Sequence, residues 1–321
     1  MSAVWPVQSR VEESARADDP YVSRAGTRAE TVPREDRVTY GEGTRWQTAS
    51  SLLSEEQVRR YDSDGFMVLD DLFTAEELHT LQMELQRLRR RHDDIDPDTV
   101  ITEPGGDELR SIFRIHQQSA VMRRLAHDAR LVGIAQRILG DAVYVHQSRL
   151  NYKPGFFGKE FYWHSDFETW HVEDGMPRMR ALSISLALTQ NTGFNGPLMV
   201  MPGSHRRYVR CVGATPDDHY KQSLRKQEYG VPDPASLHEL FELGGIAMPT
   251  GAPGRIVAFD CNTMHGSNSN ISPLPRSNVF IVYNAMSNRL VAPFGGKSPR
   301  PEFIATRTDI QAIEPRMGSL V

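Results

Sequence analysis

Three side chains of the kinds that bind transition metals stand out by type and spacing. His164 and Asp166 are two residues apart, and His265 lies in a later segment that follows an expected strand. Residues two apart on a strand share one face, so this spacing would place an imidazole and a carboxylate side by side. Two imidazoles and one carboxylate form the facial triad that leaves open positions on Fe(II) for a cosubstrate and O2. The residues therefore predict an iron site made by His164, Asp166 and His265.

An arginine follows this triad at a spacing that suits a second role. Arg276 lies eleven residues beyond His265 and just before the apolar alternation of Val279, Ile281 and Tyr283. One strand out and back would bring Arg276 beside the metal. A guanidinium binds a carboxylate through two parallel hydrogen bonds. We therefore expect Arg276 to hold a dicarboxylate cosubstrate.

Each of these residues also has a purely structural interpretation. His164 and His265 could be buried core histidines, and Asp166 could cap a turn, but the combination with Arg276 favours a site. Cys261 is expected to be a small buried strand residue. For His171, a supporting position behind the metal ligands and a surface position remain equally open.

Helices are expected in the first half of the chain. A capping-box pattern opens a short helix at Ser54, Gly65 ends it, and an apolar strand follows at 66–69. A second capping box at Thr74 precedes a helix with leucines on one face, and a third helical region runs from Ser119 to Gly140 with a break at Asp128. These helices would pack on one side of the sheet that follows.

From Ala142 onward the period changes to the alternation of strands. The first strand would place Val143, Val145, Gln147, Arg149 and Asn151 on one face, which is either exposed to solvent or lines a site. Further strands are expected at 182–188, 254–260 and 278–284. Helices followed by many short strands predict a mainly β protein with flanking helices and a jelly-roll core.

The sequence also predicts how the chain is divided. Residues 1–45 lack apolar periodicity and are expected to form a flexible tail or an arm on a partner, and 46–321 a single domain. A polar insertion at about 206–252 contains a helix capped near Ser236 and would form a lid or an interface element.

Composition narrows the classes of function. The 321 residues carry 37 Lys and Arg against 41 Asp and Glu, a formal charge of −4, which argues against broad capture of nucleic acid. Two cysteines exclude a disulfide framework, and the sequence contains neither a signal peptide pattern nor an apolar run long enough for a membrane span. We expect a cytoplasmic protein.

At the proposed metal ligands the chain also resembles a known family. The stretch from Phe161 to Pro177, FYWHSDFETWHVEDGMP, is similar to the signature of the ectoine hydroxylases, in the phytanoyl-CoA dioxygenase branch of the iron(II)/2-oxoglutarate oxygenases. The segments MPGSH at Met201, HGSNSN at His265 and SRAGTRAETVPRED at Ser23 look like the same family. The resemblance therefore covers most of the chain.

This resemblance implies a double-stranded β-helix core, a homodimer, Fe(II), 2-oxoglutarate and O2, and hydroxylation of ectoine to 5-hydroxyectoine. Beside Arg276, the residues implied to seat 2-oxoglutarate are Asn151, Ser185, Ser267 and Phe161. Ectoine combines a carboxylate with a cyclic amidinium, so Arg149 could pair with the carboxylate, Gln147 could bond a ring nitrogen, and Trp170 could cover the cationic ring. Thr169 completes the expected substrate site.

Two other functions remain open from sequence. One is a related oxygenase that acts on another small zwitterion, such as a free amino acid. The other is a jelly-roll binding protein without catalysis, in which the metal site would be vestigial.

Overall fold

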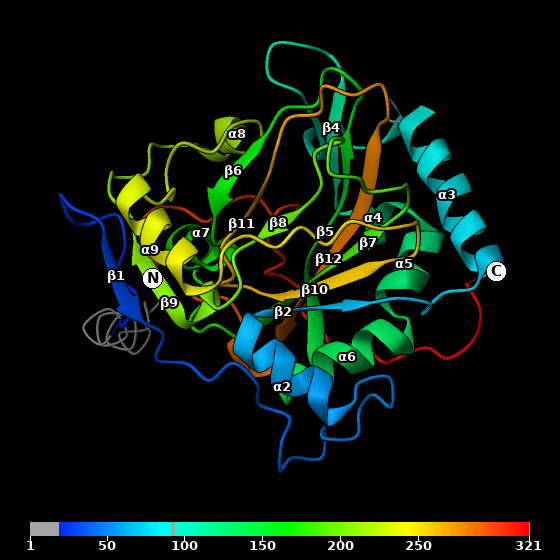
Figure 1. The fold of residues 1–321 in the computed structure, drawn as a ribbon, viewed down its shortest axis with the longest axis horizontal. Helices are drawn as coiled ribbons and strands as arrows, with labels where there is room; N and C mark the ends of the chain where they lie inside the picture. The colour runs from blue at the N-terminus through cyan, green and yellow to red at the C-terminus, as the bar shows by residue number, and fades with distance from the viewer. Residues whose placement is uncertain (1–18, 91–93, 321) are drawn as a thin grey trace, which may run out of the picture.

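Seven strands form an antiparallel sheet in the computed structural model, which describes residues 19–90 and 94–320 (Figure 1). In order across the sheet they are β2 (Phe66–Leu69), β10 (Ile256–Asp260), β7 (Ala181–Ala187), β12 (Arg276–Ala285), β5 (Val143–Lys153), β4 (Leu109–Phe113) and β3 (Val100–Thr102). A smaller antiparallel sheet has the order β6 (Phe161–His164), β11 (His265–Ser267) and β8 (Met199–Val200). Apart from β3, β4 and β5, neighbouring strands are not consecutive in the chain, which agrees with the predicted jelly-roll core.

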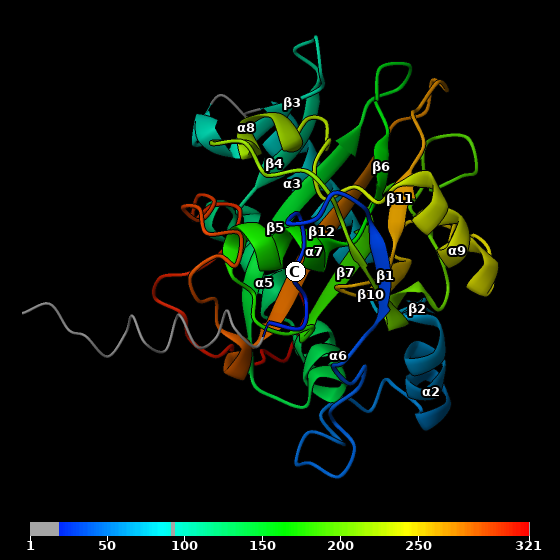
Figure 2. The same cartoon turned by 90° about the vertical axis from the view of Figure 1, so that its left-hand side faces the viewer.

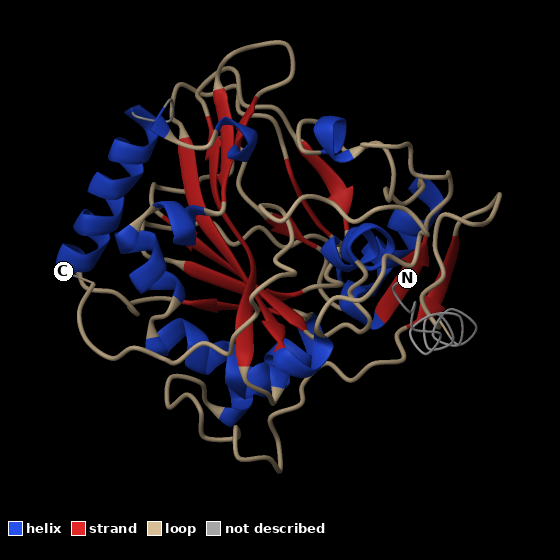
Figure 3. Cartoon of the chain, turned by 180° about the vertical axis from the view of Figure 1, so that it is seen from behind, coloured by secondary structure: helices blue, strands red, loops and turns tan. Residues whose placement is uncertain are grey.

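Helices cover the outer face of the large sheet (Figures 1 and 3). The longer ones are α2 (Glu55–Asp64), α3 (Ala75–Arg90), α5 (Ala120–Ala126) and α6 (Ala129–Leu139). Leu81, Leu85 and Leu88 of α3 belong to the same buried cluster as Leu182 and Ile184 of β7. The predicted helices and their caps are confirmed, since both capping boxes form and Asp128 separates α5 from α6.

The inner face of the large sheet lies against the small sheet. Val257 and Phe259 of β10 and Phe280 of β12 pack with Leu198 and Val200, which lie at β8. Ser183 and Ser185 share this inner side of β7, because the bulky residues between them face the helices. The alternation of small and bulky residues in β7 therefore separates a polar interior from the helix-packed core.

Strand β5 changes the facing of its side chains half way along. Val145 pairs with Tyr283 and Gln147 with Val282, which leaves His146 as an extra residue in a bulge. Val143 and Val145 consequently pack among the helices, whereas Gln147 and Arg149 line a cavity. The prediction that Val143 through Asn151 share one face is therefore wrong for the first two residues of the set.

The N-terminal segment lies along its own chain where the structure describes it. Strand β1 (Glu30–Pro33) pairs with β9 (Arg207–Arg210), and Arg34 forms a buried ion pair with Asp260 at 2.8 Å. Figure 2 shows this segment in front of α7 (Asp166–Thr169). Residues 19–45, part of the expected tail, thus pack against the rest of the described chain, and residues 1–18 lie outside the described residues.

The insertion after β8 contains β9, α8 (Tyr220–Ser223) and α9 (Pro234–Gly244). Helix α9 is confirmed, but the prediction of its cap is wrong. Asp233 is the capping residue, because its carboxylate accepts the backbone N–H of Ser236 at 2.7 Å, one turn inside the helix.

Short helical segments complete the described chain. They are η2 (Pro97–Thr99), α4 (Ile115–Gln118), the π-helical turn η3 (Trp170–Asp174), η4 (Ser204–Arg206) and η5 (Met286–Asn288). Across residues 19–90 and 94–320, no helix combines the length and the apolar content needed to cross a membrane.

Candidate active site

The small sheet and the start of α7 bring His164, Asp166 and His265 together, as predicted. His164 of β6 and His265 of β11 are directly paired across the small sheet, and their ring centroids are 4.3 Å apart. The Nε2 atoms of His164 and His265 lie 3.7 Å and 3.9 Å from the two carboxylate oxygens of Asp166. One ligand atom from each residue lies within 4.8 Å of the others, which is compact enough to surround one metal ion.

The predicted basis for the pairing of His164 with Asp166 is wrong in one respect. Strand β6 ends at His164, and Asp166 is the first residue of α7 rather than a strand residue. The turn through Ser165 still brings the carboxylate of Asp166 close to the imidazole of His164. Ser183 of β7 donates a hydrogen bond to Asp166 at 3.4 Å and helps to fix its orientation.

Backbone contacts decide which histidine nitrogen is left for a metal. The Nδ1 atom of His164 lies 2.7 Å from the carbonyl oxygen of Tyr162, and that of His265 lies 2.9 Å from the carbonyl oxygen of Thr263. Carbonyls only accept, so both Nδ1 atoms carry hydrogen and both Nε2 atoms present lone pairs. Burial, and then neighbouring His265, lower the pKa of His164 to about 4, which keeps this imidazole neutral near pH 7. The donor set therefore fits a divalent metal.

A small cavity adjoins the triad on the side of Arg276. It is lined by both metal-site histidines and by Asn151, Phe161, Ser267 and Arg276. Arg276 is buried, donates to the side-chain oxygen of Asn151 and has no hydrogen-bond partner at Nε within the described chain. Four of the five residues expected to seat 2-oxoglutarate thus line one cavity.

The electrostatics of the small cavity favour an anion. Burial, and then the charges of Arg149 and Arg110, lower the pKa of Arg276 to about 9. Burial also lowers the pKa of Arg149, whose guanidinium forms no hydrogen bond within residues 19–90 and 94–320. Buried cations without compensating anions are costly, and a bound carboxylate would offset that cost. The cavity therefore fits the distal carboxylate of a dicarboxylate.

Ser185 departs from the expected arrangement. It lines neither the small cavity nor the larger one. Its hydroxyl accepts a hydrogen bond from Asn278 at 3.1 Å within the large sheet. Lys153 was not predicted as a site residue. Its buried ammonium donates to Ser267 at 2.8 Å and so orients a hydroxyl that lines the small cavity. Its position opposite Arg276 in the sheet is a tertiary feature that strand alternation alone does not reveal.

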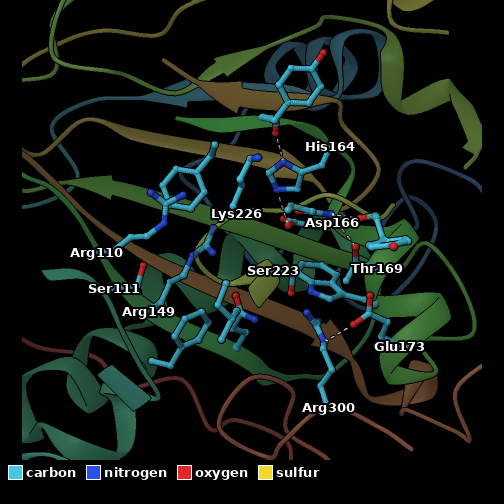
Figure 4. Close-up of a pocket in the computed structure, with 18 of the residues that line it drawn as sticks. Arg110, Ser111, Arg149, His164, Asp166, Thr169, Glu173, Ser223, Lys226 and Arg300 are labelled. Carbon is cyan, nitrogen blue, oxygen red and sulfur yellow. Dashed lines mark hydrogen bonds and ion pairs between the residues drawn. The ribbon is translucent and has the colours of Figure 1, made fainter. Parts of the chain in front are cut away.

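A larger cavity opens on the other side of His164 and Asp166 (Figure 4). It contains all four residues expected to bind the substrate, which are Gln147, Arg149, Thr169 and Trp170. Arg149 lines both cavities and separates them together with Phe161 and His164. The metal site therefore lies where a cosubstrate cavity and a substrate cavity meet.

The larger cavity is also lined by five charged residues that were not predicted as site residues, which are Arg110, Glu160, Glu173, Lys226 and Arg300. Arg110 lies over the ring of Phe161 at 3.6 Å, and Arg300 binds Asp174 through both carboxylate oxygens. Glu173 lies beside Arg300, away from the wall that carries Arg110 and Arg149 (Figure 4). Glu173 belongs to the signature stretch, whereas Arg300 comes from a C-terminal segment without periodicity.

His171 is buried behind the site, which excludes the surface alternative. Its ring stacks against Phe294 with centroids 3.9 Å apart, and its nitrogens contact the carbonyl of Met176 and the carboxylate of Asp19. His171 therefore supports the turn after α7 without reaching either cavity.

Comparisons with known proteins agree with this geometry. The family profile described as phytanoyl-CoA dioxygenase (PhyH) matches residues 61–278. The chain is 58% identical over 303 residues to the ectoine dioxygenase of Sphingopyxis alaskensis, covering 94% of this chain and 98% of that protein. It is 50% identical over 304 residues to the ectoine dioxygenase of Halomonas elongata, covering 94% and 90%.

Solved structures give the same result. The crystal structure of EctD from S. alaskensis with 2-oxoglutarate and 5-hydroxyectoine matches with a TM-score of 0.86 and 53% identity, covering 95% of this chain and 100% of that one. The structure of EctD with bound Fe matches with a TM-score of 0.84 and 52% identity, over the same shares of the two chains.

Proposed function

Since the chain belongs to the phytanoyl-CoA dioxygenase family, we propose that it hydroxylates ectoine to 5-hydroxyectoine with Fe(II), 2-oxoglutarate and O2, releasing succinate and CO2. The observation that carries the proposal is the position of the His164, Asp166 and His265 triad between a cationic cavity and a larger mixed-charge cavity. The identity of the substrate comes from the relatives.

The residues divide the work between the two cavities. His164, Asp166 and His265 would hold the iron, and Arg276 the distal carboxylate of 2-oxoglutarate, with Ser267, Asn151 and Phe161 around it. Bound iron and 2-oxoglutarate supply the oxidising chemistry with O2. The chain's own task is to aim one C–H bond of the substrate at the iron and to keep water away from it.

The larger cavity suits a small zwitterion. Arg149 offers a partly exposed guanidinium that forms no hydrogen bond within the described chain, which fits the carboxylate of ectoine. Trp170 offers an aromatic face, and Gln147 keeps its side-chain oxygen for a ring N–H because its amide nitrogen donates to Ile304. Ser185, despite the resemblance, has no place in this proposal as a direct contact to 2-oxoglutarate.

Three features remain proposals. The chain would form a single domain over 46–321, assemble as a homodimer and reside in the cytoplasm. Both cysteines are buried and unpaired, which agrees with a reducing compartment. Light scattering coupled to size-exclusion chromatography would measure the mass in solution and decide between monomer and dimer.

The function is tested with purified protein, Fe(II), 2-oxoglutarate, O2 and a substrate panel. Ectoine should give a product heavier by one oxygen with an equal amount of succinate, and free amino acids should not. H265A is the matched control, because it removes one metal ligand from β11 and leaves the backbone pairing of that strand in place. Consumption of 2-oxoglutarate without a hydroxylated product from ectoine would contradict the assignment of ectoine as substrate. Absence of any Fe(II)-dependent consumption of 2-oxoglutarate would contradict the assignment of the protein as an enzyme.

A further inference from the structure

One buried arginine of the N-terminal segment reaches the turn that carries the metal ligand. Two nitrogens of Arg24 donate to the two carboxylate oxygens of Glu168, at 2.9 Å and 2.7 Å. A third nitrogen donates to Glu173 at 2.6 Å and to Thr215 of the insertion at 2.7 Å. Arg24 is only 7% exposed, so these contacts form out of reach of bulk water.

The position of Glu168 gives this contact its meaning. Glu168 lies two residues after Asp166 in α7, and next to Thr169 and Trp170, which line the substrate cavity. Helix α7 continues directly into η3, and Ser165 makes no side-chain cap hydrogen bond at its start. A helical segment of this length, residues 166–174, has little stability of its own, so its orientation depends on tertiary contacts.

Two further contacts tie the same turn to its surroundings. The backbone N–H of Phe167 donates to the carbonyl of Cys261 at 2.8 Å, next to Asp260, which Arg34 holds. The insertion packs on the ion pair itself, since a Cβ on Gly230 would lie 2.3 Å from both Arg24 and Glu168. Arg24 is thus the point at which the N-terminal segment, α7 and the insertion meet.

Loss of Arg24 would leave Glu168 in an unfavourable state. Glu168 is 2% exposed and would keep the hydrogen bond from Ser23 but lose its cation, and a buried carboxylate without a cation is strongly destabilised. The turn would shift to bring the carboxylate to water, and Asp166, Thr169 and Trp170 would move with it.

We propose that Arg24 is a positioning residue that holds α7 through Glu168 and thereby aligns the Asp166 carboxylate with the metal and Trp170 with the substrate. The proposal rests on the proposed function of Asp166 and Trp170. It assigns a catalytic consequence to the SRAGTRAETVPRED segment. Arg24 of this segment also donates to Thr169 of the larger cavity at 3.3 Å, but within the described residues it forms no hydrogen bond to a metal ligand.

The test compares R24Q with R28Q, an exposed arginine of the same segment. Anaerobic calorimetric titration measures Fe(II) affinity without turnover, and steady-state assays measure kcat and the ratio of succinate to hydroxylated product. R24Q should weaken Fe(II) binding and lower kcat by about 10-fold, the lower end of the range for side chains bonded directly to metal ligands, because Glu168 reaches Asp166 only through the backbone of α7. It should also release excess succinate. R28Q should match the wild type.

A second comparison shows whether Arg24 acts through Glu168. E168Q should reproduce the part of the R24Q defect that passes through Glu168, while R24Q also loses the bonds of Arg24 to Glu173, Thr169 and Thr215. The double variant R24Q/E168Q should therefore be little worse than R24Q alone, because R24Q already breaks the ion pair with Glu168. A double variant whose loss of activity equals the product of the two single losses would overturn the proposal. So would a folded R24Q whose Fe(II) affinity and coupling equal those of R28Q, even with a lower melting temperature, since that describes a purely structural role.

Folding is checked by circular dichroism before any measurement. If R24Q does not fold, R24K keeps the charge but cannot reach both oxygens of Glu168, so partial loss of Fe(II) affinity and coupling is expected. Wild-type values in R24K would overturn the proposal. Failure of the wild type to hydroxylate ectoine would instead contradict the proposed function, and the two failures are thus distinguishable.

Discussion

At the scale of residues, the geometry of the metal site depends on hydrogen bonds that the spacing of residues in the sequence does not reveal. Residue types and positions were enough to predict that His164, Asp166 and His265 converge. The carbonyls of Tyr162 and Thr263, which leave both Nε2 atoms available, became visible only in the folded chain. Ser185 was expected from resemblance to reach the cosubstrate, and its bond to Asn278 uses the side chain elsewhere.

Arg276 should control affinity for 2-oxoglutarate. R276Q removes a buried cation but keeps one amide donor, so the loss is about that of one hydrogen bond to a charged partner, about 1.5–3 kcal/mol. The KM for 2-oxoglutarate should therefore rise about 10- to 100-fold, with a small effect on the KM for ectoine. Steady-state kinetics with each substrate varied in turn would measure this, with the exposed R289Q as the control. An unchanged KM for 2-oxoglutarate would contradict the assignment.

Arg149 lines both cavities, so its role needs a separate experiment. R149A should raise the KM for ectoine by a larger factor than the KM for 2-oxoglutarate, because the larger cavity then lacks an unpaired cation for the substrate carboxylate. The same kinetic series measures both constants. The opposite order would exchange the assignments of Arg149 and Arg276.

At the scale of elements, sequence patterns located the structures but not their local irregularities. Capping boxes and leucine periodicity were sufficient for α2 and α3 because these signals are local. The bulge at His146 reverses the facing of β5, and simple alternation assumes that no residue is inserted. The cap of α9 was placed at Ser236 although Asp233 and Pro234 precede it, a pattern typical of a helix start.

Glu77 anchors α3 to α6 and to the C-terminal segment. Hydrogen bonds from Arg130 lower the pKa of Glu77 from 4.5 to about 2. Because the folded-state pKa lies below the unfolded one, this stabilisation is present above pH 4.5 and is lost as the pH falls toward 2. E77Q keeps the capping geometry but loses the charge, so it should reduce the free energy of unfolding by about 2 kcal/mol at pH 7, after allowance for the partly exposed Arg130.

Urea unfolding of wild type and E77Q at a series of pH values measures this effect. The difference between the two proteins should shrink as the pH is lowered through 4.5. A difference that stays constant from pH 7 to pH 3 would show that the charge of Glu77 does not contribute.

At the scale of the whole molecule, the site is assembled from segments that are distant in the chain. The small sheet contributes the histidines, the large sheet contributes Arg276 and Arg149, and the insertion contributes a wall that includes Tyr229. Sequence reasoning predicted the jelly roll that allows this. It did not predict that Arg24 and Arg34 of the N-terminal segment would form buried ion pairs beside the site, because their burial depends on the folded chain.

Ligand binding should therefore stabilise the entire fold. Ligands that bind only the folded state at 100 times their dissociation constants add about 2.7 kcal/mol to the free energy of unfolding. Anaerobic calorimetric melting should show a rise in the melting temperature when Fe(II) and 2-oxoglutarate are added. H265A should show a much smaller rise, and an equal rise in H265A would contradict the assigned metal site.

The most direct test of the central claim follows the oxygen atoms. The protein is incubated with Fe(II), 2-oxoglutarate and ectoine under 18O2, and mass spectrometry analyses both products. The account predicts one 18O atom in 5-hydroxyectoine and one in succinate, in equal molar amounts. Labelled succinate with unmodified ectoine would contradict the proposed function.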